Sequence, residues 1–288
     1  MQSIAFAPGH ISGFFQPCYD KDPLKTGSRG AGFSVSLGAQ SKVTLEPAKK
    51  QSIQIRVNNH LDLFPVVHNC IQTILKHQLY MVSIDIQTML PFSQGFGMSA
   101  ACTLSSALGL ARLLHLPSSI AIAAAHTAEV QQNTGLGDVI GCSIGGIEIR
   151  KTPGVSPYGL IQSIPGTFEV LLGVIDTPVK TKDILKNAAL CEEIAFIGHQ
   201  CTKKLLEHPS IEAFFTLSKL FTEETGLATQ KMMDILEEID TISPCSMCML
   251  GNALFTPYSP EAESLLQKYG TTCHTSVDLQ GARLLFEK

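Results

Sequence analysis

Residues 91–101, Pro-Phe-Ser-Gln-Gly-Phe-Gly-Met-Ser-Ala-Ala, constrain the fold more than any other part of the sequence. They follow an alternating run at 83–87, typical of a half-buried strand, and precede an Ala- and Leu-rich run at 100–114, typical of a buried helix. Two glycines separated by one residue let the backbone turn tightly and approach a ligand closely. The free N–H groups at the start of the helix favour an anion. A plain strand-to-helix connection would look the same, so this segment alone leaves both interpretations open.

Two common nucleotide motifs are absent. No Gly-x-x-x-x-Gly-Lys-Ser/Thr sequence occurs anywhere in the chain, which excludes the common P-loop. Residues 91–101 also lack a Gly-x-Gly-x-x-Gly match, which argues against a dinucleotide site there.

Composition and charge exclude several function classes. The chain has 288 residues, 44% of them hydrophobic, and a net charge of -4, so it is not disordered. The slight acidity argues against general binding to nucleic acid or to an anionic membrane. The nine scattered cysteines indicate reduced thiols, and no signal peptide or apolar stretch of about 18 residues is visible. We therefore expect a cytoplasmic protein without a nucleic-acid or membrane partner.

The order of patterns predicts an α+β fold in two domains. Alternating runs at 33–37, 52–57 and 83–87 predict strands, whereas helical spacing at 65–79 and the run after Ser118 and Ser119, two plausible N-caps, predict helices. A Pro/Gly-rich stretch at 152–166 marks the expected domain boundary. The second half should contain a strand at 170–175, a helical region at 182–238 broken near Pro209 and Gly226, a strand at 253–256 and a helix at 260–269.

At residues 91–101 the sequence resembles the second motif of the GHMP kinases, the family of galactokinase, homoserine kinase and mevalonate kinase. That motif usually reads Pro-x-x-x-Gly-Leu-Gly-Ser-Ser-Ala; Phe96 and Met98 depart from it, and Ser99 keeps the second serine. The first motif is matched by Ala-Pro-Gly-His at 7–10, where His10 replaces a common lysine, and Glu129 followed by Gly-Leu-Gly-Asp at 135–138 is a further match. Residues 245–251 match the third motif poorly.

The resemblance implies a fold and a set of roles. Residues 1–158 should form a ribosomal protein S5 domain 2-like domain that binds ATP and Mg²⁺, and residues 159–288 a ferredoxin-like domain. Ser99 and Glu129 should hold Mg²⁺, and Asp138 should orient and deprotonate the hydroxyl that attacks ATP. The residues expected to wrap the ATP phosphates are Gly95, Gly97, Met98, Ser99, Ala100 and Ala101.

Residues 22–32 suggest the substrate. Their two cations, two hydroxyls and three glycines suit a carboxylate, although a solvated turn has a similar composition. Together with Pro-Gly-His-Ile-Ser-Gly-Phe-Phe at 8–15 and Ser-Met-Cys-Met-Leu-Gly at 246–251, they look like the archaeal pantoate kinases, which implies ATP and pantoate as ligands. The candidate partners of the pantoate carboxylate are Lys25, Ser28, Arg29, His126 and Arg150.

Several alternatives stay open. His126 can equally be a core histidine, and Arg150 can pair at a strand edge. The substrate can be another small hydroxy acid, of the homoserine or mevalonate type, or the chain can be a non-catalytic sensor that binds ATP and a metabolite. Cys245 and Cys248 form a Cys-x-x-Cys pair, but a structural zinc site needs four ligands and no second pair occurs. A homodimer is an expectation at the level of the family only.

Overall fold

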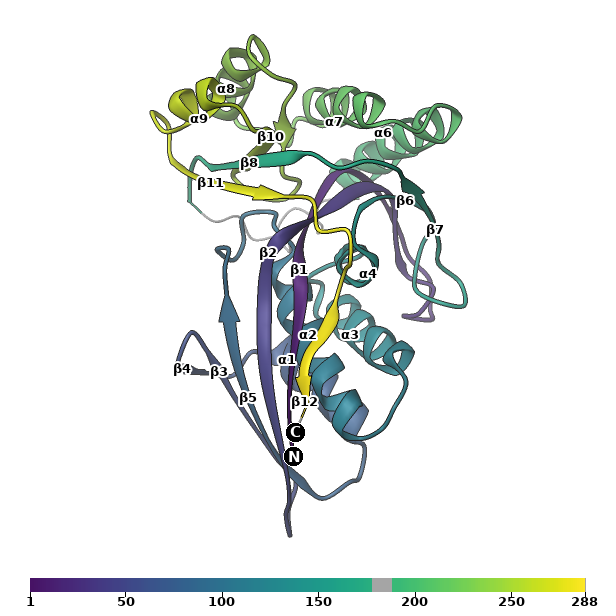
Figure 1. Cartoon of the computed structure of the whole chain (residues 1–288). Coiled ribbons are helices and arrows are strands. Elements are labelled where there is room, and N and C mark those ends of the chain that lie inside the picture. The colour runs from purple at the N-terminus through teal and green to yellow at the C-terminus, as the bar shows by residue number, and fades with distance from the viewer. Residues whose placement is uncertain (178–187, 288) are drawn as a thin grey trace.

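The computed structural model of the chain describes residues 1–177 and 188–287, which form two β-sheets covered by helices (Figure 1). The larger sheet contains the first and the last strand of the chain, and the smaller sheet lies beyond one end of it. This arrangement confirms the predicted α+β class. No helix among the described residues is long and apolar enough to cross a membrane.

The larger sheet is built on a hairpin of two long strands, β1 (Gln2–Cys18) and β2 (Gly27–Pro47). The strand order is β12-β1-β2-β5-β3-β4, and β6 pairs with β2 and with β7. The pair of β3 and β5 is parallel, whereas the other described pairs in this sheet are antiparallel. The remaining strands are β3 (Ser52–Val57), β4 (His60–Asp62), β5 (Tyr80–Thr88), β6 (Ile147–Thr152), β7 (Leu160–Ile164) and β12 (Arg283–Glu287).

The hairpin corrects the expectation of a Gly-rich loop at residues 22–32. The turn ends at Thr26, whose backbone N–H donates to the Asp22 carbonyl (3.0 Å), and β2 begins at the next residue. A Cβ at Gly30, where φ is 139°, would lie 2.3 Å from the carbonyl oxygen of Phe14. This glycine therefore permits close strand pairing near an irregularity of the β1–β2 register, and the segment is not an open anion-binding loop.

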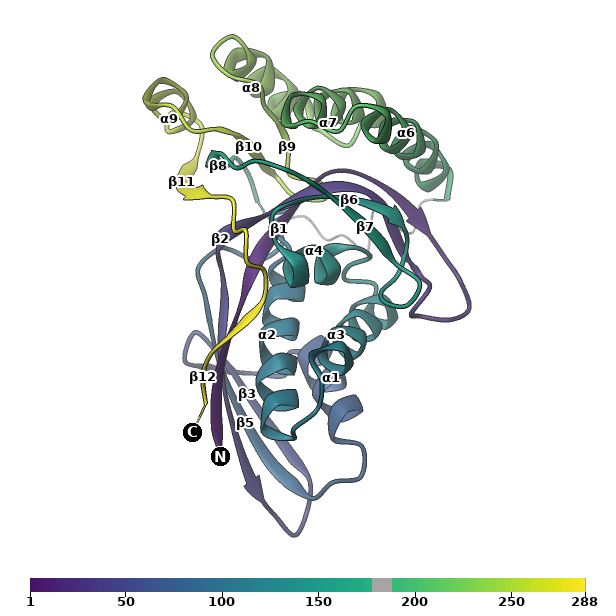
Figure 2. The ribbon, with the colours of Figure 1, turned by 45° about the vertical axis from the view of Figure 1, so that its right-hand side comes forward.

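One face of the larger sheet is covered by four helices (Figure 2), namely α1 (Pro65–Leu75), α2 (Met98–Leu113), α3 (Ser118–Gln132) and α4 (Asp138–Ile144). α2 packs on β1 and β2, and α3 packs on α1 and α2. The predicted helix at 65–79 ends earlier because Lys76 adopts a φ of 53°. α3 begins at Ser118 itself, so Pro117 occupies the N-cap and no serine side chain caps the helix, contrary to the prediction.

The smaller sheet is antiparallel, with the strand order β11-β8-β10-β9, and consists of β8 (Glu169–Val174), β9 (Ser246–Met247), β10 (Ala253–Pro257) and β11 (Thr271–Ser276). The described helices of this half are α6 (Ala188–Glu207), α7 (Ile211–Thr225), α8 (Gln230–Asp240) and α9 (Pro260–Leu266). Both predicted helix breaks are confirmed. The Ser210 side chain accepts a hydrogen bond from the Ala213 N–H at the start of α7, and Gly226 ends that helix with a φ of 61°. The predicted helical residues 182–187 lie outside the described residues.

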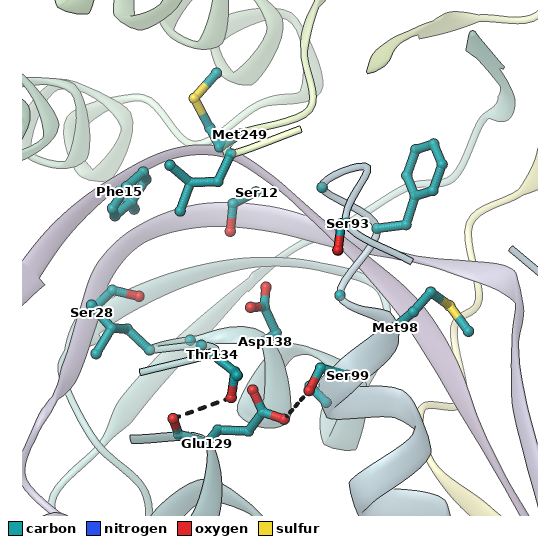
Figure 3. Close-up of a pocket in the computed structure, with 18 of the residues that line it drawn as sticks. Ser12, Phe15, Ser28, Ser93, Met98, Ser99, Glu129, Thr134, Asp138 and Met249 are labelled. Carbon is teal, nitrogen blue, oxygen red and sulfur yellow. Dashed lines mark hydrogen bonds between the residues drawn. The ribbon is translucent and has the colours of Figure 1, made fainter. Parts of the chain in front are cut away.

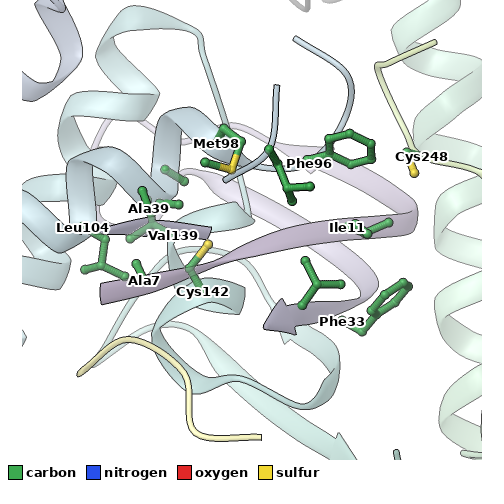
Figure 4. Packing of buried hydrophobic residues seen from close by; sticks show 14 of the residues in the cluster. Ala7, Ile11, Phe33, Ala39, Phe96, Met98, Leu104, Val139, Cys142 and Cys248 are labelled. Carbon is green, nitrogen blue, oxygen red and sulfur yellow. The ribbon is translucent and has the colours of Figure 1, made fainter. Parts of the chain in front are cut away.

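Aromatic side chains join the two sheets into one hydrophobic core. The ring centroid of Phe33 on β2 lies 5.2 Å from that of Phe255 on β10 and 5.9 Å from that of Phe214 on α7. Ile11, Phe33 and Phe96, the last from the segment before α2, belong to one cluster of buried side chains (Figure 4). The β1–β2 hairpin of the larger sheet therefore also packs against β10 and α7 in the second half of the chain.

The chain passes between the sheets more than once. β7 follows residue 158 and lies within the Pro/Gly-rich stretch at 152–166, yet it pairs with β6 of the larger sheet. β12 returns to β1, where Glu287 lies opposite Ser3. The division into domains at 1–158 and 159–288 stays a prediction.

The contact of α6 with β1 gives a prediction about stability. A Cβ at Gly198 would lie 2.0 Å from the backbone oxygen of Phe15, so Gly198→Ala forces the helix and strand apart. We expect the free energy of unfolding to fall by about 1–3 kcal/mol, although alanine has the higher helix propensity. Chemical denaturation measures this change, and Gln200→Ala on the exposed side of α6 is the control. A stabilised Gly198→Ala variant would contradict the described packing.

Candidate active site

A cavity of about 390 Å³ lies between the start of α2, the start of α4 and the β1–β2 hairpin (Figure 3). Asp138 lies near its middle, with Met98 and Ser99 on one side and Phe15 and Ser28 on the other. The cavity is lined by Ser12, Phe15, Ser28, Phe92, Ser93, Gly95, Phe96, Gly97, Met98, Ser99, Ala100, Glu129, Asn133, Thr134, Gly135, Leu136, Gly137, Asp138, Met249 and Leu250.

Two glycines shape the loop before α2. Gly95 and Gly97 have φ values of 78° and 61°, a backbone region that side chains disfavour. A Cβ at Gly95 would lie 2.8 Å from the Cys248 carbonyl oxygen, and one at Gly97 would lie 2.9 Å from the His10 carbonyl oxygen. The loop is thus held between β1 and the segment after β9, which fixes the direction of α2.

The start of α2 offers unpaired backbone donors to the cavity. Gly97 is the N-cap, so the first N–H groups of the helix have no partner within it. Ala101, in contrast, is fully buried and donates its N–H to the Gly97 carbonyl (3.0 Å). Of the predicted ATP-binding residues, those that line the cavity are Gly95, Gly97, Met98, Ser99 and Ala100, and Ala101 lies behind them.

Ser99 and Glu129, from α2 and α3, meet at one end of the cavity. Ser99 Oγ donates to Glu129 Oε1 at 2.6 Å, whereas Glu129 Oε2 is buried without a hydrogen-bond partner. Burial raises the pKa of Glu129 to about 7, although the hydrogen bond from Ser99 lowers it. An unpaired oxygen of a buried carboxylate beside a hydroxyl suits a hard cation, so this pair fits the predicted Mg²⁺ ligands.

Asp138 is the first residue of α4 and is fixed by His10 of β1. His10 Nδ1 lies 2.8 Å from Asp138 Oδ1, and His10 Nε2 lies 2.9 Å from Glu148 Oε1 on β6. The His10 side chain is fully buried, whereas the Asp138 side chain is 28% exposed. Asp138 therefore presents its carboxylate to the cavity while His10 holds it from behind.

The two carboxylates keep His10 charged. Burial alone would lower the pKa of His10, but the charge of Glu148 and the hydrogen bonds to Asp138 and Glu148 raise it to about 9. Burial acts to raise the pKa of Asp138, yet the hydrogen bond and charge of His10, with the charge of Arg150, keep that pKa below its usual value. Asp138 is thus an ionised carboxylate that faces the cavity at neutral pH.

Arg150 lies behind the cavity wall. Its guanidinium is buried, donates through Nη1 to Glu148 Oε1 and through Nη2 to Ser12 Oγ (3.1 Å), and does not line the cavity. A Cβ at Gly137 would lie 2.4 Å from Ser28 Oγ and 2.8 Å from Arg150 Nε. The structure thus brings Ser28 to the cavity and Arg150 directly behind it.

The other three predicted substrate residues lie outside the cavity lining. His126 Nε2 donates to the Thr26 carbonyl (2.8 Å), and burial lowers the pKa of His126, so this imidazole is neutral. The exposed Lys25 ammonium lies 5.0 Å from the ring centroid of Tyr158. Arg29 Nη1 lies 3.4 Å from His199 Nδ1 on α6.

The most important residue that the sequence reasoning missed is Glu148. A signal existed in the sequence, because Glu148 and Arg150 are two residues apart in what is now β6 and therefore point to the same face of that strand. Ser12, Phe15 and Met249 lie within segments that carried the resemblance, but they received no role.

Cys245 and Cys248 are buried free thiols. Cys245 Sγ donates to the Leu236 carbonyl (3.3 Å), and across residues 1–177 and 188–287 no group of three or more His, Cys, Asp or Glu residues could hold a metal ion. In the described part of the chain, Cys245 and Cys248 are therefore buried core residues.

Comparisons with known proteins identify the family of the chain. The family of GHMP kinases N terminal domains matches residues 65–146. The pantoate kinase of Methanocaldococcus jannaschii is 35% identical over 252 residues, which cover 87% of this chain and 90% of that protein. The pantoate kinase of Methanospirillum hungatei is 33% identical, with 98% of this chain and 96% of that protein covered.

A solved structure described as a phosphotransferase related to the CoA biosynthesis pathway has the same fold. Its TM-score is 0.90 at 28% identity, and the match covers 99% of this chain and 98% of that one. The predicted GHMP kinase fold is confirmed. The chain belongs to the GHMP kinase superfamily and, within it, to the family of the pantoate kinases.

Proposed function

We propose that this chain transfers the γ-phosphoryl group of ATP to the primary hydroxyl of (R)-pantoate and forms 4-phosphopantoate on the route to coenzyme A. The observation that carries the proposal is Asp138, an ionised carboxylate between a glycine-rich helix start and a second, partly apolar end of one cavity. Similarity to pantoate kinases supports this choice of substrate.

Asp138 would act on the hydroxyl of the substrate. It accepts the hydroxyl proton while that oxygen attacks the γ-phosphorus, and the bond from the γ-phosphorus to the bridging oxygen of ADP breaks. Because an ordinary aspartate is a weak base, with a pKa of about 3.9 when unperturbed, alignment should matter more than proton affinity. His10 supplies that alignment through its 2.8 Å hydrogen bond.

The end of the cavity beyond Asp138 suits pantoate. Pantoate carries two methyl groups on C3, next to the carbon that bears its primary hydroxyl. Phe15, Leu136 and Met249 line the cavity and offer apolar surface for these methyls. Ser28 is the predicted carboxylate partner in the lining, and Arg150 lies behind it with a buried Nε that has no hydrogen-bond partner. Roles for Lys25, Arg29 and His126 stay predictions.

Ser99 and Glu129 are the proposed Mg²⁺ ligands because Glu129 Oε2 is buried and unpaired beside the Ser99 hydroxyl. When bound, the metal would neutralise charge on the phosphates. The N–H groups at the start of α2 would bind phosphate oxygens directly.

Two predictions about the protein as a whole belong to this proposal. We place the enzyme in the cytoplasm, because the reaction consumes ATP, and we expect a homodimer from its family. Size-exclusion chromatography with light scattering measures the oligomeric state.

The first prediction concerns Asp138. Asp138→Asn should reduce kcat by at least about 100-fold, because a positioned general base typically contributes at least that much. Nucleotide binding, measured by calorimetry, should stay as in the parent protein. Asp85→Asn is the control, because Asp85 forms an exposed ion pair with Arg56. An active Asp138→Asn variant would refute the assignment.

The second prediction concerns the metal. Glu129→Gln keeps the size of the side chain but removes its charge, so the Mg²⁺ concentration that gives half the maximal rate should rise about tenfold. Titration of Mg²⁺ at fixed ATP measures this, with the exposed Glu212→Gln as control. An unchanged Mg²⁺ requirement would remove Glu129 from the site.

The third prediction concerns the substrate. In a coupled ADP assay, kcat/KM should be higher for D-pantoate than for pantothenate, homoserine or mevalonate. The analogue 2,4-dihydroxybutanoate, which lacks both methyls, should lose about 10-fold or more, since each buried methyl contributes about 0.8 kcal/mol. Preference for homoserine or mevalonate would assign the chain to another hydroxy acid, and no ADP with any substrate would favour a sensor.

A further inference from the structure

A line of four charged side chains runs through the protein behind the cavity. It consists of Asp138 on α4, His10 on β1, and Glu148 and Arg150 on β6. His10 and Glu148 are 0% exposed and Arg150 is 1% exposed. Negative and positive groups alternate along the line, which balances buried charge that would otherwise be costly.

Glu148 stands between two cations. Its Oε1 accepts hydrogen bonds from His10 Nε2 (2.9 Å) and from Arg150 Nη1. The two donors lie only 3.5 Å apart. Without the carboxylate, an imidazolium would face a guanidinium at that distance in a buried site, and the imidazole would lose its proton first because arginine does not deprotonate in proteins.

The His10 ring has no room to move away. A Cβ at Gly32 on β2 would lie 2.7 Å from His10 Nε2, and one at Gly141 on α4 would lie 2.2 Å from His10 Cδ2. The ring is thus held in a slot between two glycines. Its Nδ1 faces Asp138, and its Nε2 faces Glu148.

The line ends at two walls of the cavity. At one end His10 fixes Asp138, and at the other end Arg150 Nη2 donates to Ser12 Oγ, which lines the cavity. Glu148 itself does not line the cavity, so any effect that it has on the reaction passes through His10 and Arg150.

We propose that Glu148 is a positioning residue for phosphoryl transfer, because it holds His10 through Nε2 and keeps the ring cationic, so that His10 Nδ1 gives Asp138 a charge-assisted hydrogen bond. This inference rests on the proposed function and adds to it a residue that never touches the substrate.

The pairing of His10 with Glu148 predicts the direction in which the pH dependence of kcat should shift when Glu148 is replaced. The titratable and charged groups that face His10 are Asp138 on α4, and Glu148 and Arg150 on β6; the nearby Cys142 on α4 stays a neutral thiol, since burial raises its pKa. Because Glu148 raises the pKa of His10, its removal lowers that pKa. His10 then becomes neutral at a lower pH, and its hydrogen bond to Asp138 loses the support of the positive charge as the pH rises.

The test is Glu148→Gln, which keeps the shape and one acceptor but removes the charge. In the parent protein kcat should fall only as the pH approaches about 9, the pKa of His10. In Glu148→Gln that fall should begin at least one pH unit lower, which is about a tenfold loss in the affected range, while the KM for ATP stays unchanged. An unmoved alkaline limb would overturn the proposal.

Glu169→Gln is the matched control. Glu169 also accepts a hydrogen bond from a histidine, His274 (2.9 Å), but this pair is exposed and is not part of the cavity lining. Its pH profile should match that of the parent protein. A general effect of glutamate replacement would instead shift both profiles.

A measurement on the parent protein keeps the inference falsifiable if Glu148→Gln does not fold. With ¹⁵N-labelled histidine, NMR should report both His10 ring nitrogens as protonated at pH 8, and a His10 that titrates near pH 6.5 overturns the inference. This readout needs no substrate. If pantoate is not phosphorylated but His10 is charged, the proposed function fails while the charge line stands.

Discussion

The pairing of β1 with β2 is the constraint on which the rest of the structure depends. Its register runs from Gln2 opposite Thr44 to Cys18 opposite Gly27, so two strands span both parts of the molecule. One end carries α2, and the other is covered by α6 and α7. His10, Ser12, Phe15 and Ser28 all owe their positions to this one ladder of hydrogen bonds. A slip of the ladder would move an entire wall of the cavity and reverse the face on which each side chain lies.

Buried charge gives the site its rigidity. The surface pair of Arg56 and Asp85, each 42% exposed, contributes little because water competes for both groups. His10 and Glu148 are fully buried, so water cannot replace either partner when the other is removed. Charges fixed before the substrate arrives need no reorganisation during the reaction. The identities of residues 10, 148 and 150 are therefore linked, although residue 10 is remote in sequence from the other two.

Local features could be predicted from the sequence, and long-range partners could not. Backbone preferences of single residues and their neighbours account for three of these features. They are the turn at Gly95 and Gly97, the helix after it and the helix break at Gly226. The loop expected around Ser28 is a strand because its partner lies in β1, which no short pattern reveals. Since neighbours in a strand point to opposite faces, Ser28 lines the cavity while Arg29 turns toward His199. The partners of His10 come from α4 and β6, so the reason for the histidine appears only in the folded chain.

The return of β12 to β1 has a consequence for biosynthesis. Residues 2–18 leave the ribosome long before residues 283–287, which pair with their outer edge. Until then β1 presents unpaired N–H and C=O groups, the kind of strand edge that other chains can extend. The larger sheet therefore cannot be completed until the last strand has been synthesised, and the edge of β1 stays open until then. Proteolytic removal of the last strand would recreate the same hazard in the finished protein.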